Sequence, residues 1–271
     1  RKTFSFEYDK DWISSHAQML LDPDLGWYSG PQYPNDKDNF GIFLDSMPDS
    51  WGRTLMQRRE PIRAREEERE PRKLHDIDFL LGVYDDSSMG ALRFKLDPNG
   101  PFLETGSSTT TPPWTTLDEL QEAVRIIESD EDDEHIRKWI LMLIAPGSSL
   151  GGARPKANFT DSSKNLWIAK FPSKNDKIDK AAWELLAYRL ALKAGIRMSE
   201  SRITKLSGAY NTFLTKRFDR ILNERIHFAS AMTMTGNYEE VLRDKNASYL
   251  EIAEFIKYSG AENMEDLHQL W

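Results

Sequence analysis

The segment between residues 147 and 218 constrains the fold most, because extended and helical patterns follow one another there in a fixed order. A glycine-bearing loop at 147–156 comes first. Two apolar runs, at 157–160 and 165–171, then have the residue types of β-strands, and polar turn residues separate them. These two runs are expected to pair as an antiparallel hairpin.

One helix and a second pair of strands complete this segment. Asp179 is a suitable N-cap for a helix that runs to Ala194, and Gly195 follows at the usual stop position. Residues 203–206 and 212–218 predict two further strands joined by a turn. A glycine loop, two strands, one helix and two strands are, in this order, typical of the nucleotide-binding lobe of a kinase.

Shorter patterns lie on both sides of this segment. A period-two alternation predicts a strand at 3–8, and a short helix or turn at 78–84 precedes another predicted strand at 89–94. Other patterns predict a linker at 97–113 and helices from about Pro48, from Thr116, at 136–145, from Ser248 to about Tyr258 and from about Asn263. The expected fold class is α+β, with an N-terminal α/β subdomain and linker at 1–130. A kinase-like lobe of antiparallel sheet plus helix, and the start of a helical C-terminal lobe, are expected at 131–271.

The composition excludes several classes of protein. The chain has 271 residues, no cysteine and a formal net charge of −8. The lack of cysteine excludes disulfides, thiolate zinc sites and cysteine nucleophiles, and the negative charge argues against coating nucleic acid by overall charge. The five histidines have no metal-binding spacing. No apolar run approaches the roughly 18 residues of a membrane span, and the cytoplasm is the default location.

Three features of the predicted lobe have the chemistry that nucleotide binding needs. The small residues of 148–156 let backbone amides approach phosphates. Lys170 lies in an apolar strand, where burial of its ammonium is costly unless an opposite charge such as that of Glu184 pairs with it. The strand 213–218 is a candidate for the hinge that offers backbone groups to an adenine edge. Taken singly, each also suits a structural role: a hairpin-entry loop, a lysine that extends from a strand end to solvent, or a strand with a charged exit.

Several segments together resemble the HipA family of toxin kinases, in the same order along nearly the whole chain. They are FLDSMPDSWGR at 43–53, DFLLGV at 78–83, MGALRF at 89–94, GGARPK at 151–156, IAKFPS at 168–173, KRFDR at 216–220 and RIHF at 225–228. The first three are similar to the family's N-terminal signature. The others are similar to its phosphate loop, its nucleotide lysine, its hinge and the segment beyond the hinge.

The resemblance implies a serine/threonine kinase that uses ATP and Mg²⁺, with a HipB-like antitoxin as its partner and as its main route to DNA. The nucleotide-binding residues that it implies are Gly151, Gly152, Ala153, Arg154, Pro155, Lys156, Lys170, Lys216, Arg217 and Phe218. It also implies that Ser149 is a self-regulating phosphorylation site. The catalytic aspartate and the metal ligands are expected beyond Trp271, so the chain is expected to be incomplete at its C-terminus and inactive alone.

The leading hypothesis is therefore part of a toxin kinase that transfers the γ-phosphate of ATP to serine or threonine of a cytosolic protein. Two other functions fit the same residues. One is a non-catalytic module that binds an antitoxin or acts as a corepressor, and the other is the lobe of a small-molecule or lipid kinase. The expected catalytic residues beyond Trp271 favour the first alternative for this chain by itself, whereas Lys170 and the loop favour a kinase.

Overall fold

The computed structural model describes residues 4–35, 37–48, 50–103, 116–129, 139–140, 142–143, 152–221, 224–238, 242 and 247–271. By their contacts the residues form two compact units. One comprises Arg1–Asp45 and Phe228–Trp271, and the other comprises Ser46–His227. The subdomain boundary that the sequence predicts near residue 130 lies outside the described residues and stays a prediction.

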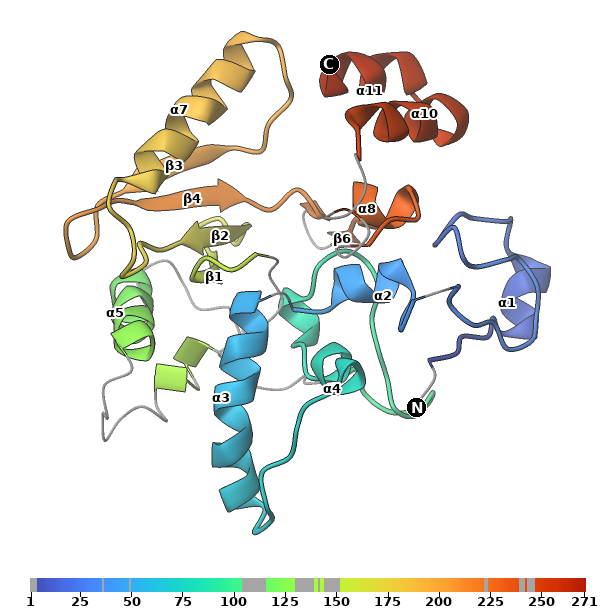
Figure 1. The fold of residues 1–271 in the computed structure, drawn as a ribbon, viewed down its shortest axis with the longest axis horizontal. Coiled ribbons are helices and arrows are strands. Elements are labelled where there is room, and N and C mark those ends of the chain that lie inside the picture. The colour runs from blue at the N-terminus through green and yellow to red at the C-terminus, as the bar shows by residue number, and fades with distance from the viewer. Residues whose placement is uncertain are drawn as a thin grey trace. The chain divides into compact units, whose positions relative to one another are not determined.

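The unit Ser46–His227 contains a four-stranded antiparallel sheet in the order β1-β2-β4-β3 (Figure 1). Its strands are β1 (Lys156–Thr160), β2 (Leu166–Lys170), β3 (Ser201–Thr204) and β4 (Thr212–Lys216). β1 and β2 form the expected hairpin, and β4 pairs with both β2 and β3. The α+β fold class and the antiparallel sheet are confirmed, although β3 begins at Ser201 and not at residue 203.

Helix α7 (Lys180–Lys193) connects β2 to β3 and contacts β3 and β4 (Figure 1). Its N-cap is Asp179, whose carboxylate accepts a hydrogen bond from the amide of Ala182 at 3.0 Å. Gly195 follows the helix with a φ of +83°, a conformation that glycine adopts without strain. Both ends of α7 therefore lie where the sequence predicts them.

The core of this unit lies against one face of the sheet. Alternate residues of β1 and β2 are buried there: Ala157, Phe159, Trp167 and Ala169. Helix α5 (Leu117–Ser129) contacts β4 through Gln121, whose side-chain oxygen accepts a hydrogen bond from Thr212 Oγ1 at 2.7 Å. Helix α3 (Ser50–Glu66) contacts β1 through Trp51, whose indole nitrogen donates to the carbonyl oxygen of Lys156 at 3.0 Å.

Shorter elements complete the two units. In Ser46–His227 they are α4 (Asp76–Leu81), the 3₁₀-helix η1 (Asp85–Ser87), β5 (Arg220–Ile221) and β6 (Glu224–Arg225). In the other unit they are α1 (Lys10–Ser15), α2 (Gly41–Ser46, all but its last residue), α8 (Ala231–Met234), α10 (Tyr249–Ser259) and α11 (Asn263–Leu270). None of the helices in the described ranges has both the length and the apolar character needed to cross a membrane.

Two strand predictions are wrong. Of the strand predicted at 3–8, the described part forms only an isolated bridge between Phe6 and Gln32, and its aromatic rings pack in a cluster that includes Phe43. Residues 89–94 form no strand, because Gly90 has a φ of +73° and its amide donates to the carboxylate of Asp219. Most of the helix predicted at 136–145 lies outside the described residues.

Candidate functional site

Lys170 and Glu184 form an ion pair between the end of β2 and helix α7. Nζ of Lys170 lies 2.6 Å from Oε2 of Glu184, and the two side chains are 31% and 32% exposed. The centre of the Phe213 ring lies 5.4 Å from the same Nζ. The ammonium is thus held in place without being enclosed, so an anionic group can approach it from solvent.

The alternation of β2 places Lys170 on the face of the sheet opposite to that of Trp167 and Ala169. Trp167 and Ala169 point to the buried face, while the residues between them are half-buried. Residues that lie opposite one another in antiparallel strands share a face. By this register, the residues that share the face of Lys170 are Lys156, Asn158, Ile168, Phe213 and Thr215.

The described part of the glycine-bearing loop begins at Gly152, and Ser149 and Gly151 lie outside it. Gly152 has a φ of +88°, and a Cβ there would lie 3.1 Å from Nζ of Lys156, so both backbone and space favour glycine. Lys156 is 5% exposed, and its Nζ donates to the carbonyl oxygen of Gly152 at 2.9 Å. The ammonium of Lys156 therefore fixes the backbone of the loop at Gly152.

Arg154 connects the loop, through Asp176, to Lys180 in the first turn of α7. Its guanidinium lies 2.9 Å from the carboxylate of Asp176, which is 1% exposed and also lies 3.0 Å from Nζ of Lys180. Burial raises the pKa of Asp176, but a backbone hydrogen bond and the two cations outweigh it and hold the pKa below its usual value. Of the other assigned loop residues, Ala153 is exposed and Pro155 is buried.

The predicted hinge follows β4 and is fixed to the sheet by its backbone. The amide of Lys216 donates to the carbonyl oxygen of Glu200 at 2.8 Å, and that of Arg217 donates to the carbonyl oxygen of Leu166 at 2.9 Å. Phe218 is 58% exposed. These three predicted hinge residues line a cavity of about 340 Å³. Their binding to a nucleotide base stays a prediction.

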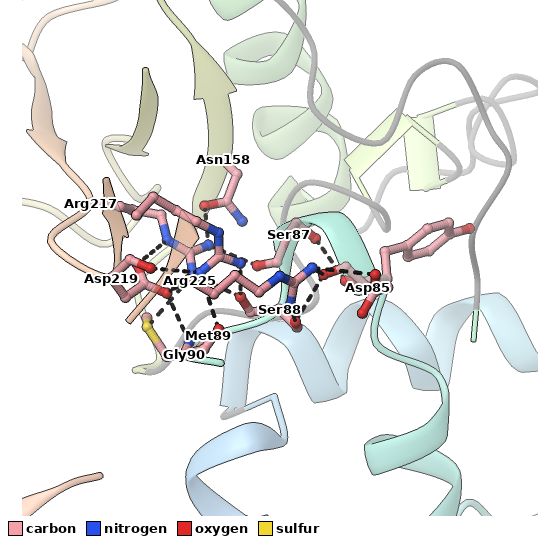
Figure 2. A network of polar contacts seen from close by, with 11 residues as sticks. Asp85, Ser87, Ser88, Met89, Gly90, Asn158, Arg217, Asp219 and Arg225 are labelled. Carbon is pink, nitrogen blue, oxygen red and sulfur yellow. Dashed lines mark hydrogen bonds and ion pairs between the residues drawn. The ribbon is translucent and has the colours of Figure 1, made fainter. Parts of the chain in front are cut away.

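The side chain of Arg217 belongs to a buried polar network (Figure 2). It donates to both carboxylate oxygens of Asp219, at 2.8 and 2.5 Å, and both side chains are 1% exposed. Its Nη1 also donates to the carbonyl oxygen of Ser87 at 2.7 Å and to Oδ1 of Asn158 at 2.9 Å. Arg217 therefore connects the end of β4 to β1 and to residues far earlier in the chain.

The carboxylate of Asp219 is the centre of this network. It also accepts from the amide of Gly90 at 2.8 Å and from Nη1 of Arg220 at 2.7 Å. Burial raises the pKa of Asp219, but the hydrogen bond and charge of Arg217, the Gly90 amide and Arg220 together hold it below its usual value. Burial, followed by the charge of Arg217, lowers the pKa of Arg220 to about 10.

The lowered pKa of Asp219 predicts an acid-dependent loss of stability. A carboxyl group with a depressed folded-state pKa stabilises the fold fully above its ordinary pKa of 3.8. That contribution is lost as the pH falls through the lower folded-state value. We expect the unfolding free energy of Asp219→Asn to fall less steeply below pH 4 than that of the wild-type chain, measured by urea denaturation. Equal slopes would show that Asp219 is not held in its charged form by the fold.

Comparisons with known proteins show a similar fold and a similar C-terminal domain. The chain is similar to a chain of the solved complex of Shewanella oneidensis MR-1 HipA, HipB and operator DNA, with a TM-score of 0.55 and 17% sequence identity. The similarity covers 97% of this chain and 62% of that chain. Residues 148–271 match the family model of the HipA-like C-terminal domain. A search of the curated proteins finds no match.

The antiparallel sheet, its single crossing helix and the likeness over nearly the whole chain define an α+β protein with a HipA-like fold. The likeness of residues 148–271 to the HipA-like C-terminal domain covers just under half of the chain. The chain spans about three fifths of the length of its structural relative.

The network around Asp219 was not predicted from the sequence. MGALRF at 89–94 and KRFDR at 216–220 are separate segments in the sequence, and the structure joins them through Gly90 and Asp219. The available signal was an aspartate among three arginines, Arg217, Arg220 and Arg225. Within the described part of the chain, no group of three or more acidic or histidine side chains is arranged to hold a metal ion.

Proposed function

We propose that residues 148–218 form the nucleotide-binding lobe of a HipA-like serine/threonine kinase. The observation that carries this proposal is the partly exposed ion pair of Lys170 and Glu184 between β2 and α7. Kinases use a strand lysine, steadied by a helix glutamate, to contact the phosphates of ATP. The HipA-like C-terminal domain match over the same residues supports it.

The residues present fit ATP in charge and in backbone geometry. Lys170 supplies a partly exposed ammonium for phosphate oxygens, and Gly152 supplies a loop backbone whose φ only glycine tolerates well. Lys216, Arg217 and Phe218 would face the base, and Arg154 and Lys156 would hold the loop in place through Asp176 and the carbonyl oxygen of Gly152. Bound ATP would supply the phosphoryl group that is transferred to a serine or threonine hydroxyl.

The proposal includes parts beyond this chain. The catalytic aspartate and the ligands of Mg²⁺ would come from residues that follow Trp271 in a longer protein. A HipB-like antitoxin would neutralise the kinase and connect it to DNA, as the structural relative was solved with HipB and operator DNA. Phosphorylation of Ser149, beside the loop, would place about −1.5 to −2 charges where phosphates bind and so switch the kinase off. The protein substrate would be cytosolic.

ATP is expected to bind the 271-residue chain weakly, with a dissociation constant of about 1 mM, because one lobe provides only part of the contacts. In amide NMR spectra, the shifts that saturate with ATP should gather at residues 152–156, at Lys170 and at 216–218. Lys170→Met keeps the aliphatic stem but removes the ammonium, so it should weaken binding about tenfold. The matched control is Lys193→Met, since Lys193 is exposed at the other end of α7.

Two results would contradict the proposal. One is the absence of saturable shifts in the wild-type chain. The other is equal ATP affinity in the Lys170→Met and Lys193→Met variants. Either would favour a non-catalytic interaction module, and binding of a HipB-like protein without nucleotide binding would then be its defining property.

A further inference from the structure

Two segments that lie far apart in the sequence interlock beside the predicted hinge (Figure 2). The amide of Gly90 donates to Oδ2 of Asp219, across 129 residues of sequence, at 2.8 Å. Arg217 donates to the carbonyl oxygens of Ser87 and Ser88 at 2.7 and 2.9 Å. The bend at 87–90 is thus hydrogen-bonded to the side chains of Arg217 and Asp219, which precede and follow Phe218 in the sequence.

The arginines beyond the hinge reinforce this contact. Arg220 donates to the carbonyl oxygens of Ser88 and Gly90 at 2.7 and 3.2 Å. Arg225 of β6 donates to Oγ of Ser88 at 2.8 Å and to the carbonyl oxygen of Asp85. Burial lowers the pKa of Arg225, and its guanidinium lies 3.3 Å from the Asp85 carboxylate. Charged side chains buried in this way keep one geometry, because leaving any of them unpaired is costly.

The network lies beside the predicted hinge and can therefore affect the backbone of 216–218. On its other side, the hinge is bonded to the sheet through the amides of Lys216 and Arg217. Residue 219 is fixed in addition through its carbonyl oxygen, which accepts from the amide of Ile226 at 3.0 Å. The backbone of 216–218 is therefore held between the sheet and the bend at 87–90.

We propose that Asp219 is a positioning residue that, with Arg217, sets the backbone of 216–218 from the bend at 87–90 and thereby the affinity for the base of the nucleotide. This inference rests on the proposed nucleotide site. Asp219 does not contact the ligand in this proposal. It acts through the hinge, so the phosphate end of the site, at Lys170 and Gly152, is independent of it.

The test compares two ligands that share phosphates but differ in the base, namely ATP and inorganic tripolyphosphate. In the full chain, Asp219→Asn removes the charge that pairs with Arg217 and Arg220 and keeps the shape of the side chain. We expect ATP affinity to fall by about tenfold, while tripolyphosphate affinity stays within about twofold. Lys170→Met is the control for the phosphate end of the site and should weaken the binding of both ligands.

A second variant keeps the proposal testable if Asp219→Asn does not fold. Arg225→Lys keeps a charge but loses the two-pronged contact with Ser88 and Asp85. It should weaken ATP binding by about two- to fivefold with the same sparing of tripolyphosphate, and circular dichroism reports whether each variant is folded.

The outcomes separate this inference from the proposed function. Unchanged ATP affinity in both folded variants overturns the positioning role and leaves the nucleotide site standing. Parallel losses of ATP and tripolyphosphate also overturn it, since they indicate a general structural role. Failure of the wild-type chain to bind ATP overturns the proposed function, and this inference with it.

Discussion

Under the proposed kinase function, changing Lys170 to alanine is expected to slow phosphoryl transfer by about 10²–10³-fold in a longer protein that carries the proposed catalytic residues. The Lys170 ammonium is held 2.6 Å from Glu184 and is about one third exposed, so it is preorganised and still accessible to phosphates. Such a charge stabilises the negative charge of the transferring group, and water does not replace it well.

The measurement is the initial rate of transfer of labelled γ-phosphate, with the melting temperature as a check on folding. Lys193→Ala should keep the wild-type rate, because Lys193 is exposed and lies at the far end of α7. Glu184→Gln should give an intermediate loss, since it releases the ammonium without removing it. Near-normal turnover of Lys170→Ala would show that Lys170 does not lie at the phosphates.

Changing Phe159 to alanine is expected to lower the free energy of unfolding of the sheet-containing unit by about 3–5 kcal/mol. Phe159 of β1 is fully buried, and its ring stacks on that of Trp167 with 6.2 Å between centroids. Truncation would remove the apolar contact and leave a cavity in a rigid sheet that cannot close around it.

Urea denaturation followed by tryptophan fluorescence would report this loss, because Trp167 lies beside the cavity. Phe159→Leu should cost less than about 1.5 kcal/mol, since most of the volume is kept. Tyr249→Ala, on α10 at 74% exposure, should change the stability by less than about 0.5 kcal/mol. A loss below about 1 kcal/mol for Phe159→Ala would mean that this core rearranges freely.

Local patterns predicted the helices and the sheet well. The starts of α3 and α5 and both ends of α7 and α10 depend on residues within one or two turns, and they lie near their predicted positions. The hairpin of β1 and β2 also depends on neighbouring residues. Lys170 and Glu184 lie only 14 residues apart, so alternation and the following helix sufficed to predict their ion pair.

Features that depend on distant partners were not predictable in this way. The apolar alternation at 89–94 indicated a strand, but the amide of Gly90 finds its acceptor in Asp219 and not in a neighbouring strand. The aromatic residues at 4–8 likewise pack as a cluster and pair with Gln32 at one bridge only. An alternation of period two shows only which side chains are apolar. The hydrogen bonds of the backbone depend on which other segments lie beside it in the folded chain.

The contact between Gly90 and Asp219 also has a consequence for synthesis of the chain on the ribosome. Asp219 is added 129 residues after Gly90. At roughly 5–20 residues per second, the bend at 87–90 waits about 6–26 s for its partner. During that time its carbonyl groups are without the arginine donors that they bond to in the folded chain. A nascent chain arrested before residue 219 should therefore be open to proteases at 87–90, and one long enough for residues 217–225 to have left the ribosome should be protected.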